Sequence, residues 1–310
     1  MSQGDRLILL VSRSRIEEAA RDIRSAATQL VAHGLVPVIT AEATNEAIQL
    51  GGVEAAFGLV AGSFRELGKD AEQDDIELAL VLGGDGSILK AAELVRESNI
   101  PLLGINLGHV GFLAEGEKHE MDAVLGHIAA REYSVQERMA LDVSVLENGR
   151  KVYSTWALNE ATVEKSARER MLEVVLEVEE HPLSSFGCDG VVMSTPTGST
   201  AYAFSAGGPV VWPNVEAILM VPLSAHALFA RPLVVNPEAL LAVEVLRRSA
   251  GSGVLWCDGR RTFELAPGSR VEVRKSAQGV KIVRLDDSSF TNRLVNKFSL
   301  PVAGWRGPEA

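Results

Sequence analysis

The stretch Ile76–Val95, IELALVLGGDGSILKAAELV, decides the fold of the first part of the chain. Its opening segment, Ile76–Leu82, is almost entirely apolar, as expected of a parallel strand that is covered on both faces. A glycine-rich turn follows, and apolar residues then recur at helical spacing over Ile88–Val95. A strand that leads through such a turn into a helix is one step of a parallel α/β sheet.

The segments around this stretch continue the same alternation. We expect further strands at Leu7–Val11, Leu35–Thr40 and Pro101–Ile105, because each is a short apolar run. Helical spacing of apolar residues marks the segments from Ile16 to Val31 and from Met121 to Ile128. The sequence therefore predicts an N-terminal, Rossmann-like parallel α/β domain over residues 1–133.

The pattern changes after Tyr133. Strand-like runs come in quick succession, separated by turn signals such as Asn148-Gly149 and Pro267-Gly268. An antiparallel β domain is predicted over residues 134–288, and a cleft between two such domains is a common place for a ligand. Residues 289–310, with a helix at Phe290–Phe298, are expected to return to the first domain. The predicted fold class is thus α/β plus all-β.

Composition limits the partners. The chain has 310 residues and a formal net charge of −11, which disfavours binding to nucleic acid or to an anionic membrane. Its two cysteines, Cys188 and Cys257, form no disulfide framework and no zinc motif. Neither a signal peptide nor an apolar run of about 18 residues is present, so a cytoplasmic protein is expected.

The turn Gly83-Gly84-Asp85-Gly86-Ser87 is the first candidate site. Glycines let a ligand approach the backbone, and the start of a helix favours an anion, so Gly83, Gly84, Gly86 and Ser87 are predicted to bind phosphate. Asp85 would repel phosphate and needs another task. It either holds a metal ion or accepts a proton from a hydroxyl that attacks phosphorus. The structural alternative is a helix cap.

Two further clusters lie in the β-rich part. One begins at Asp189 and extends through the run from Ser194 to Pro209, where hydroxyls, glycines and Tyr202 suit the ribose and base of a nucleotide. The other is the pair Asn159-Glu160, which offers a donor and acceptors to a sugar or a base edge. Each cluster also has a purely structural explanation. The first could be a polar connection with Tyr202 in the core, and the pair Asn159-Glu160 could be an ordinary strand end.

Taken together, these motifs resemble the NAD kinase family, bacterial type, and the resemblance runs nearly end to end. The STPTGSTAY run is highly specific, whereas GGDG also occurs in lipid kinases and 6-phosphofructokinases. At the position of Ser87, phosphofructokinases favour serine, and NAD kinases often carry threonine. The motifs that carry the resemblance are GGDG at 83–86, the stretch from Asn106 to Leu113, Leu158-Asn159-Glu160, DGVVMSTPTGSTAYAFSAGGP at 189–209, HALFARP at 226–232, and Cys257-Asp258-Gly259-Arg260.

This resemblance implies transfer of the terminal phosphoryl group of ATP, or of inorganic polyphosphate, to the 2′-hydroxyl of the adenosine ribose of NAD, giving NADP. It implies that Asp85 is the proton acceptor. The residues that it places at NAD are Asp85, Gly86, Lys90, Asn159, Glu160, Arg170, Asp189, Thr200, Ala201, Tyr202, Ala203, Phe204 and Ser205. Gly187 stands where some relatives carry an arginine that contacts the ligand, so this chain lacks that side chain.

The resemblance also bears on cofactors and partners. We see no metal cage in the sequence, so a divalent cation, most simply Mg²⁺, is expected to arrive with ATP. A homo-oligomer, dimer or tetramer, is expected. Two other functions stay open: a lipid or sugar kinase that uses the same GGDG turn, and a non-catalytic NAD(P) sensor. The first leaves Asn159-Glu160 unexplained, and the second leaves Asp85 without a task.

Overall fold

The structure, a computed structural model of the chain, describes residues 5–12, 16–108, 111–167, 171–285 and 290–302, without the side chains of residues 16–19. It divides into two compact units. The first contains the described residues up to Glu137 and those from Val280 onward, and the second comprises Arg138–Gly279. Each unit is a layered structure with its own core.

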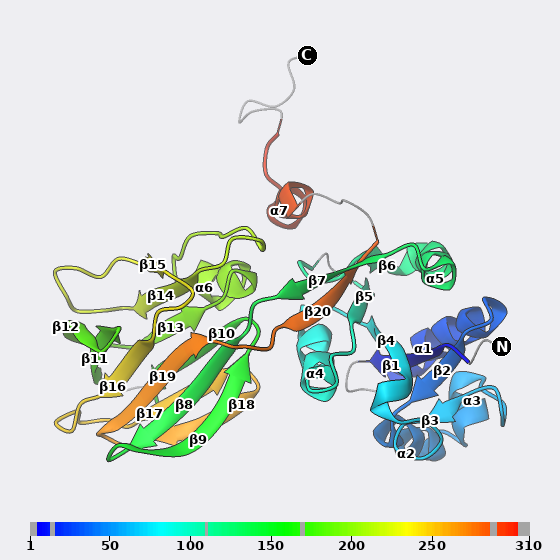
Figure 1. Cartoon of the computed structure of the whole chain (residues 1–310), viewed down its shortest axis with the longest axis horizontal. Helices are drawn as coiled ribbons and strands as arrows, with labels where there is room; N and C mark the ends of the chain where they lie inside the picture. Colours follow the sequence, from blue (N-terminus) through cyan, green and yellow to red (C-terminus); the bar gives the residue numbers. More distant parts are fainter. Residues whose placement is uncertain (1–4, 13–15, 109–110, 168–170, 286–289, 303–310) are drawn as a thin grey trace. The chain divides into compact units, whose positions relative to one another are not determined.

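The first unit is built on a mostly parallel sheet with the strand order β3-β2-β1-β4-β5-β20-β7, in which β6 pairs with β5 (Figure 1). Its strands are β1 Leu7–Ser12, β2 Val36–Ile39, β3 Arg65–Glu66, β4 Ile76–Leu82, β5 Leu102–Asn106, β6 Gly116–Glu117, β7 Ser134–Arg138 and β20 Val280–Arg284. Its helices are α1 Ile16–Ala32, α2 Ala41–Gln49, α3 Val53–Phe57, α4 Asp85–Val95, α5 Met121–Ala130 and α7 Phe290–Phe298, with 3₁₀ turns η1 Gln73–Asp75 and η2 Lys118–Glu120.

Helices cover both faces of this sheet. Leu78, Leu80 and Leu82 of β4 share one core cluster with the apolar stripes of α1 and α5. The alternate residues of β4 point to the opposite face, and α4 packs on β1, β4 and β5. At Gly104 of β5 a Cβ atom would overlap the side chain of Ile88, so the glycine permits this close approach of α4. The near-continuous burial of β4 explains why its sequence is apolar throughout.

The chain returns to the first unit near its C-terminus. Strand β20 pairs in parallel with β5, so the compact β unit ends at Gly279 and not at residue 288 as the sequence pattern predicts. The sequence pattern does not show which sheet β20 joins. The strand is nearly fully buried and directly follows a series of antiparallel strands, so its pattern fits either sheet. Helix α7 has the predicted bounds, Phe290–Phe298, and its Phe290 and Phe298 rings contact Phe112 in the first unit.

The second unit contains two antiparallel sheets of six strands, ordered β15-β14-β13-β10-β17-β18 and β12-β11-β16-β19-β8-β9. Side chains of both sheets form one shared apolar core. The elements are β8 Leu141–Glu147, β9 Arg150–Ala157, β10 Glu160–Lys165, β11 Leu172–Val178, β12 His181–Cys188, β13 Gly190–Ser194, η3 Thr197–Thr200, α6 Tyr202–Ser205, β14 Ile218–Leu223, β15 Leu233–Val235, β16 Leu241–Val245, β17 Gly253–Cys257, β18 Arg261–Leu265 and β19 Ser269–Lys275.

The predicted fold class is therefore confirmed: a parallel α/β sheet, an antiparallel β part, and a C-terminal segment within the first unit. Cys188 and Cys257 are free and buried, and burial raises the pKa of each thiol to about 12. Within the described residues, no helix has the length and apolar character needed to cross a bilayer.

Candidate active site

The β4–α4 turn holds the glycine-rich motif. Gly83 has φ +151°, and a Cβ atom there would overlap the Ser87 hydroxyl, so the turn requires a residue without a side chain. The Gly83 N–H donates to the Ile105 carbonyl at 2.9 Å, which ties the turn to β5. Gly84 caps α4 and its carbonyl accepts the Ser87 N–H at 2.9 Å, whereas the N–H groups at the very start of a helix have no partner within it. The turn therefore presents N–H groups to an anion.

Asp85, the first residue of α4, is held by the loop that follows β5. Its Oδ2 accepts the Phe112 N–H at 3.0 Å and its Oδ1 accepts the Leu113 N–H at 3.1 Å. A Cβ atom at Gly111 would overlap Asp85 Oδ1, so this loop touches the carboxylate directly. A carboxylate has about four lone-pair sites, and these hydrogen bonds use two of them. The rest are able to accept a proton from a substrate hydroxyl.

The loop is itself fixed by charged side chains from the end of the chain. Arg293 of α7 donates to the Phe112 and Ala114 carbonyls at 3.0 and 2.8 Å and to Glu115 Oε1 at 2.6 Å. Arg284 of β20 also donates to Glu115, whose side chain is fully buried. These contacts place two arginines around one buried carboxylate. The Phe112 residue, whose carbonyl accepts from Arg293, also donates its N–H to Asp85. The C-terminal segment thus helps to position Asp85.

In the second unit, Asn159-Glu160 lies at the start of β10, between β13 and β17. The register pairs Glu160 with Ser194 and Ala161 with Cys257, so the ends of both neighbouring strands meet this point. On the β13 side, the Thr195 N–H donates to the Asn159 carbonyl at 2.9 Å, and Thr195 Oγ1 donates to the Leu158 carbonyl at 2.6 Å. The STPTG turn is thus anchored on the peptides of the pair.

On the β17 side, Asp258 performs the complementary task. Its carboxylate accepts the backbone N–H groups of Leu158, Asn159 and Glu160 at 2.9, 2.7 and 3.3 Å. Arg261 donates to the same carboxylate at 2.6 Å. Burial raises the pKa of Asp258, while the backbone N–H groups and the Arg261 charge partly offset that effect. In the sequence, Asp258 is recognisable only as part of a family motif. In the structure, it orients three consecutive peptides.

Glu160 is an almost fully buried acid. Its exposed fraction is 7%, and among the described residues its Oε2 has no hydrogen-bond partner. Burial raises the pKa of Glu160 to about 8, the Asp258 charge adds to this rise, and the Tyr202 N–H partly offsets it. The side chain is therefore mostly protonated at neutral pH, and a neutral carboxyl group is both a donor and an acceptor.

The segment Thr200–Ser205 lies beside this pair. Gly198 packs directly on the Asn159 carbonyl, where a Cβ atom would overlap it. Ala203 is fully buried, whereas the rings of Tyr202 and Phe204 are 38% and 40% exposed. Tyr202 is therefore not a core residue; burial raises the pKa of its hydroxyl, and the Glu164 charge adds to this rise. Tyr202, whose N–H donates to Glu160, thus presents a partly exposed ring beside Glu160 that suits a flat base.

Asp189 lies at the far end of the same strand pair. Its neighbour Gly190 pairs with Glu164, four residues along β10 from Glu160, which corresponds to roughly 14 Å. Lys165 contacts the Asp189 carboxylate, and this hydrogen bond lowers the pKa of Asp189. Sequence reasoning missed Lys165, although a lysine that ends a buried strand is a recognisable signal. Besides burial, the Glu160 and Asp189 charges both raise the pKa of the Tyr202 hydroxyl, so the Tyr202 side chain lies within electrostatic reach of both ends of this strand pair.

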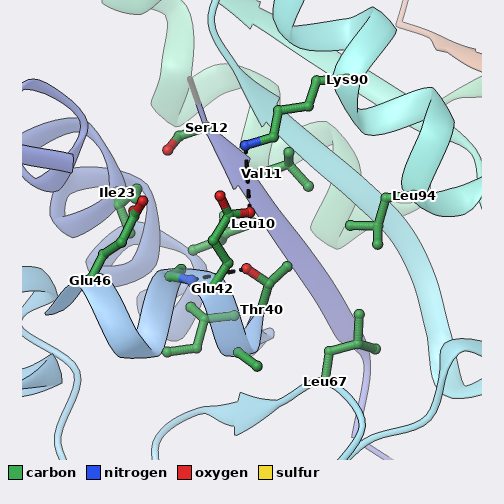
Figure 2. A pocket seen from close by; sticks show the side chains of 13 residues that line it. Leu10, Val11, Ser12, Ile23, Thr40, Glu42, Glu46, Leu67, Lys90 and Leu94 are labelled. Carbon is green, nitrogen blue, oxygen red and sulfur yellow. Dashed lines mark hydrogen bonds and ion pairs between the residues drawn. The ribbon is translucent and has the colours of Figure 1, made fainter. Parts of the chain in front are cut away.

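One predicted residue, Lys90, stands apart from these groups. Lys90 extends from α4 toward the start of α2, where its ammonium group lies 3.5 Å from the Glu42 carboxylate (Figure 2). Arg170 lies outside the described residues. Gly187 is in close contact with Met171, whose sulfur lies where a Cβ atom at Gly187 would be.

The geometry and the comparisons define the class and then the family. A carboxylate held beside a glycine turn that suits phosphate is compatible with a phosphotransferase, in which an aspartate accepts the proton of the attacking hydroxyl. The ATP-NAD kinase N-terminal domain family matches residues 9–133, and the ATP-NAD kinase C-terminal domain family matches residues 158–285. These matches cover most of the chain, and the chain belongs to the ATP-NAD kinase family.

Individual relatives agree. The chain is 54% identical over 306 residues to the NAD kinase of Leifsonia xyli subsp. xyli, covering 99% of this chain and 98% of that one. It is 62% identical over 234 residues to NAD kinase 2 of Streptomyces coelicolor, covering 76% and 77%. Among solved structures, yeast NADH kinase complexed with NADH superposes with a TM-score of 0.83 at 20% identity, covering 98% of this chain and 90% of that chain.

A more distant structure has the same fold. The NAD kinase from Archaeoglobus fulgidus in complex with ATP superposes with a TM-score of 0.67 at 22% identity, covering 94% of this chain and 98% of that chain. The family and the kinase class that the sequence predicted are therefore confirmed.

The contact between Gly111 and Asp85 predicts a positional defect. Gly111→Ala should lower kcat by about tenfold to a hundredfold, because the added methyl group displaces the Asp85 carboxylate. Gly126→Ala in α5 is the matched control, since its Cβ would meet only His33 at 3.9 Å. Steady-state kinetics together with thermal melting measure both effects. Equal kcat values in the two variants would contradict the proposed contact.

The buried Arg293–Glu115 pair predicts a linked loss of stability and turnover. Arg293→Met leaves the Glu115 carboxylate with one arginine fewer and should cost about 3–5 kcal/mol of unfolding free energy, measured by urea denaturation. Turnover should fall as well, because the Phe112 peptide loses a hydrogen bond. Asn296→Ala, an exposed change on the same helix, should alter neither quantity. Wild-type turnover in a folded Arg293→Met protein would refute the positioning role.

The raised pKa of Glu160 predicts a pH-dependent stability difference. In the unfolded chain a glutamate loses its proton near its ordinary pKa, whereas the folded protein keeps it until about pH 8. The wild-type protein should therefore lose stability relative to Glu160→Gln as pH rises from about 4.5 to 8, by up to on the order of 4 kcal/mol. Urea denaturation of both proteins from pH 5 to pH 8.5 measures this difference. A difference that stays constant across this range would contradict it.

Proposed function

We propose that the protein transfers the terminal phosphoryl group of ATP to the 2′-hydroxyl of the adenosine ribose of NAD, producing NADP and ADP. The observation that carries this proposal is the Asp85 carboxylate, which is fixed by two backbone N–H groups within a turn otherwise suited to phosphate. A turn that only bound phosphate would be better without this charge. Family membership supplies the identity of the substrates.

The reaction balances without further reactants. The ribose 2′-oxygen forms a bond to the γ-phosphorus, the bond between that phosphorus and the β,γ-bridging oxygen breaks, and the hydroxyl proton passes to an Asp85 oxygen. ADP leaves with the bridging oxygen. Because the transition state is loose, Asp85 orients the hydroxyl first and receives its proton late. The two N–H groups from Phe112 and Leu113 keep the carboxylate aimed during this step.

The β unit is assigned the recognition of NAD. We assign the residues around the start of β10 and in the segment from the end of η3 through α6 to the adenosine part of NAD. These are Asn159, Glu160, Thr200, Ala201, Tyr202, Ala203, Phe204 and Ser205. Tyr202 and Phe204 present partly exposed rings to the base, and protonated Glu160 is able to donate to a ribose or base acceptor. Asp189, roughly 14 Å along the strands, is assigned to the nicotinamide end.

The remaining assignments follow the family pattern. Gly86 adjoins Asp85 on the exposed side of the turn and is assigned to NAD with it. Lys90 and Arg170 are assigned to NAD by resemblance. Gly83, Gly84, Gly86 and Ser87 are assigned to the phosphates of the donor.

The donor is proposed to bring a divalent cation, Mg²⁺. Within the described part of the chain, no three His, Cys, Asp or Glu side chains are arranged to hold a metal ion. A cation held mainly by phosphate oxygens fits such a donor set, because Mg²⁺ commonly binds through substrate phosphates and one or two carboxylates. When bound, the cation would neutralise charge on the triphosphate. The chain has an overall charge of −11, so this neutralisation is needed.

Three further properties complete the proposal. Inorganic polyphosphate is a second candidate donor, since the GGDG turn recognises phosphate rather than a base. A homo-oligomer, dimer or tetramer, is proposed from the family. A cytoplasmic location is proposed, supported by two free cysteines. The lipid or sugar kinase and the NAD(P) sensor are not favoured, because the family match extends through both parts of the chain.

The direct test is a coupled assay. Purified protein is mixed with NAD, ATP and Mg²⁺, and NADP is followed with an NADP-specific dehydrogenase. NADP formation is expected; its absence with Mg²⁺, Mn²⁺ and Ca²⁺, and with either ATP or polyphosphate, would overturn the proposal.

Asp85→Asn tests the role of the carboxylate. Asparagine retains the shape but cannot accept the proton as a carboxylate does, so kcat should fall about 10²- to 10⁴-fold. Binding of NAD, measured by calorimetry, should be retained. Turnover near the wild-type level would remove Asp85 from the proton-accepting role.

A further inference from the structure

A cavity in the first unit lies outside the residues assigned so far, Lys90 excepted. It has a volume of about 360 Å³, within the range of about 300–1,000 Å³ that is usual for small-molecule sites. Its walls come from the ends of β1 and β2, from the start of α2 and from α4 (Figure 2). Most of the lining is aliphatic, including Leu10, Val11, Ile39, Leu67 and Leu94.

The cavity lies where an open α/β sheet most often binds a ligand. From the adjacent strands β1 and β4, the chain proceeds outward in opposite directions, to β2 on one side and to β5 on the other. Ligands bind in the crevice outside the carboxyl ends of the strands at such a switch point. Ser12, which ends β1 and lines the cavity, is the register partner of Leu82, which ends β4. The next residue is Gly83, so the cavity adjoins the phosphate turn.

The charges of the lining select the part of a nucleotide that would enter. Glu42 and Glu46 oppose the single cation Lys90, so the charged lining residues sum to −1 and do not favour a triphosphate. Aliphatic walls with carboxylate oxygens at the rim suit an uncharged flat ring that carries an amino group. The 6-amino group of adenine is such a donor.

We infer that this cavity binds the adenine base of the phosphoryl donor, with the 6-amino group facing Glu42 or Glu46 and the phosphates extending to the GGDG turn. The inference rests on the proposed function. It assigns the base of ATP, and not that of NAD, to the cavity, because the partly exposed Tyr202 and Phe204 rings that suit the NAD adenine belong to the β unit. The two nucleotides then have separate base sites within the chain, and Lys90, which the resemblance assigns to NAD, faces the donor instead.

A binding test separates this inference from the proposed function. Ala43, in the first turn of α2, lines the cavity, whereas Asn45 on the same helix is exposed and does not. Ala43→Leu should weaken the binding of ADP with Mg²⁺ by at least about tenfold in calorimetry, because the larger side chain occupies the space of the base. Binding of NADP should be unchanged. Asn45→Leu should leave both affinities unchanged.

A base substitution checks the polar contact. The wild-type enzyme should prefer ATP to inosine triphosphate, whose base carries a carbonyl group where adenine has the amino group. Glu42→Gln combined with Glu46→Gln should reduce this preference in kcat/KM by at least about tenfold. Inorganic triphosphate, which has no base, should be used equally well or equally poorly by the wild-type protein and Ala43→Leu.

The outcomes are distinct. If NADP forms but Ala43→Leu binds ADP as tightly as the wild-type protein, the inference is wrong and the proposed function stands. If Ala43→Leu instead weakens NADP, the cavity belongs to the acceptor and the inference is overturned. Failure of the protein to form NADP at all would count against the proposed function, whereas the calorimetric result for ADP would still be decisive for the cavity.

Discussion

Two hydrogen bonds from consecutive peptides to Asp85 are the constraint on which the candidate site depends. They join the start of α4 to the loop after β5, and they fix both oxygens of the carboxylate. Glycines at 83 and 111 are needed because each lies where a side chain would collide with Ser87 or with Asp85. Arg284 and Arg293 then hold the loop through Glu115. The distant C-terminal segment is thus part of the support for one carboxylate.

The β unit uses the same physical device. Asp258 accepts three consecutive backbone N–H groups before β10, and Arg261 compensates its charge. The Arg261 guanidinium in turn lies 4.4 Å from the centre of the Trp156 ring, which adds a cation–π contact. In both units a carboxylate that accepts backbone N–H groups fixes the peptides near a candidate ligand site. Such groups are held by the fold, so little reorganisation is needed when a substrate binds.

Much of the fold was predictable because its physical signals are local. The apolar run of β4 and the helical spacing of α5 and α7 follow directly from burial, and these elements form as predicted. Helix α4 begins at Asp85, three residues before its first apolar residue, because the glycine turn supplies its cap. The partner of β20 was not predictable, since strand patterns do not specify which sheet a strand joins.

The site was predictable only in part. Its motifs could be found in the sequence, and the family resemblance gave roles to their residues. The positioning residues are a different case: Glu115 lies in none of the motifs identified in the sequence, yet its side chain is fully buried. Its partners are 169 and 178 residues away along the chain, beyond the reach of any local pattern. Glu160 is similar, because its raised pKa depends on long-range burial and on Asp258.

In the proposed reaction, Asp85 receives the proton of the NAD 2′-hydroxyl. The most direct measurement is the distance between these groups in a crystal structure of the protein with NAD, Mg²⁺ and a non-hydrolysable ATP analogue. The 2′-oxygen is expected about 2.6–3.2 Å from an Asp85 oxygen, with the γ-phosphorus on its other side. A 2′-oxygen bound to another side chain, with both Asp85 oxygens beyond about 4 Å, would contradict it.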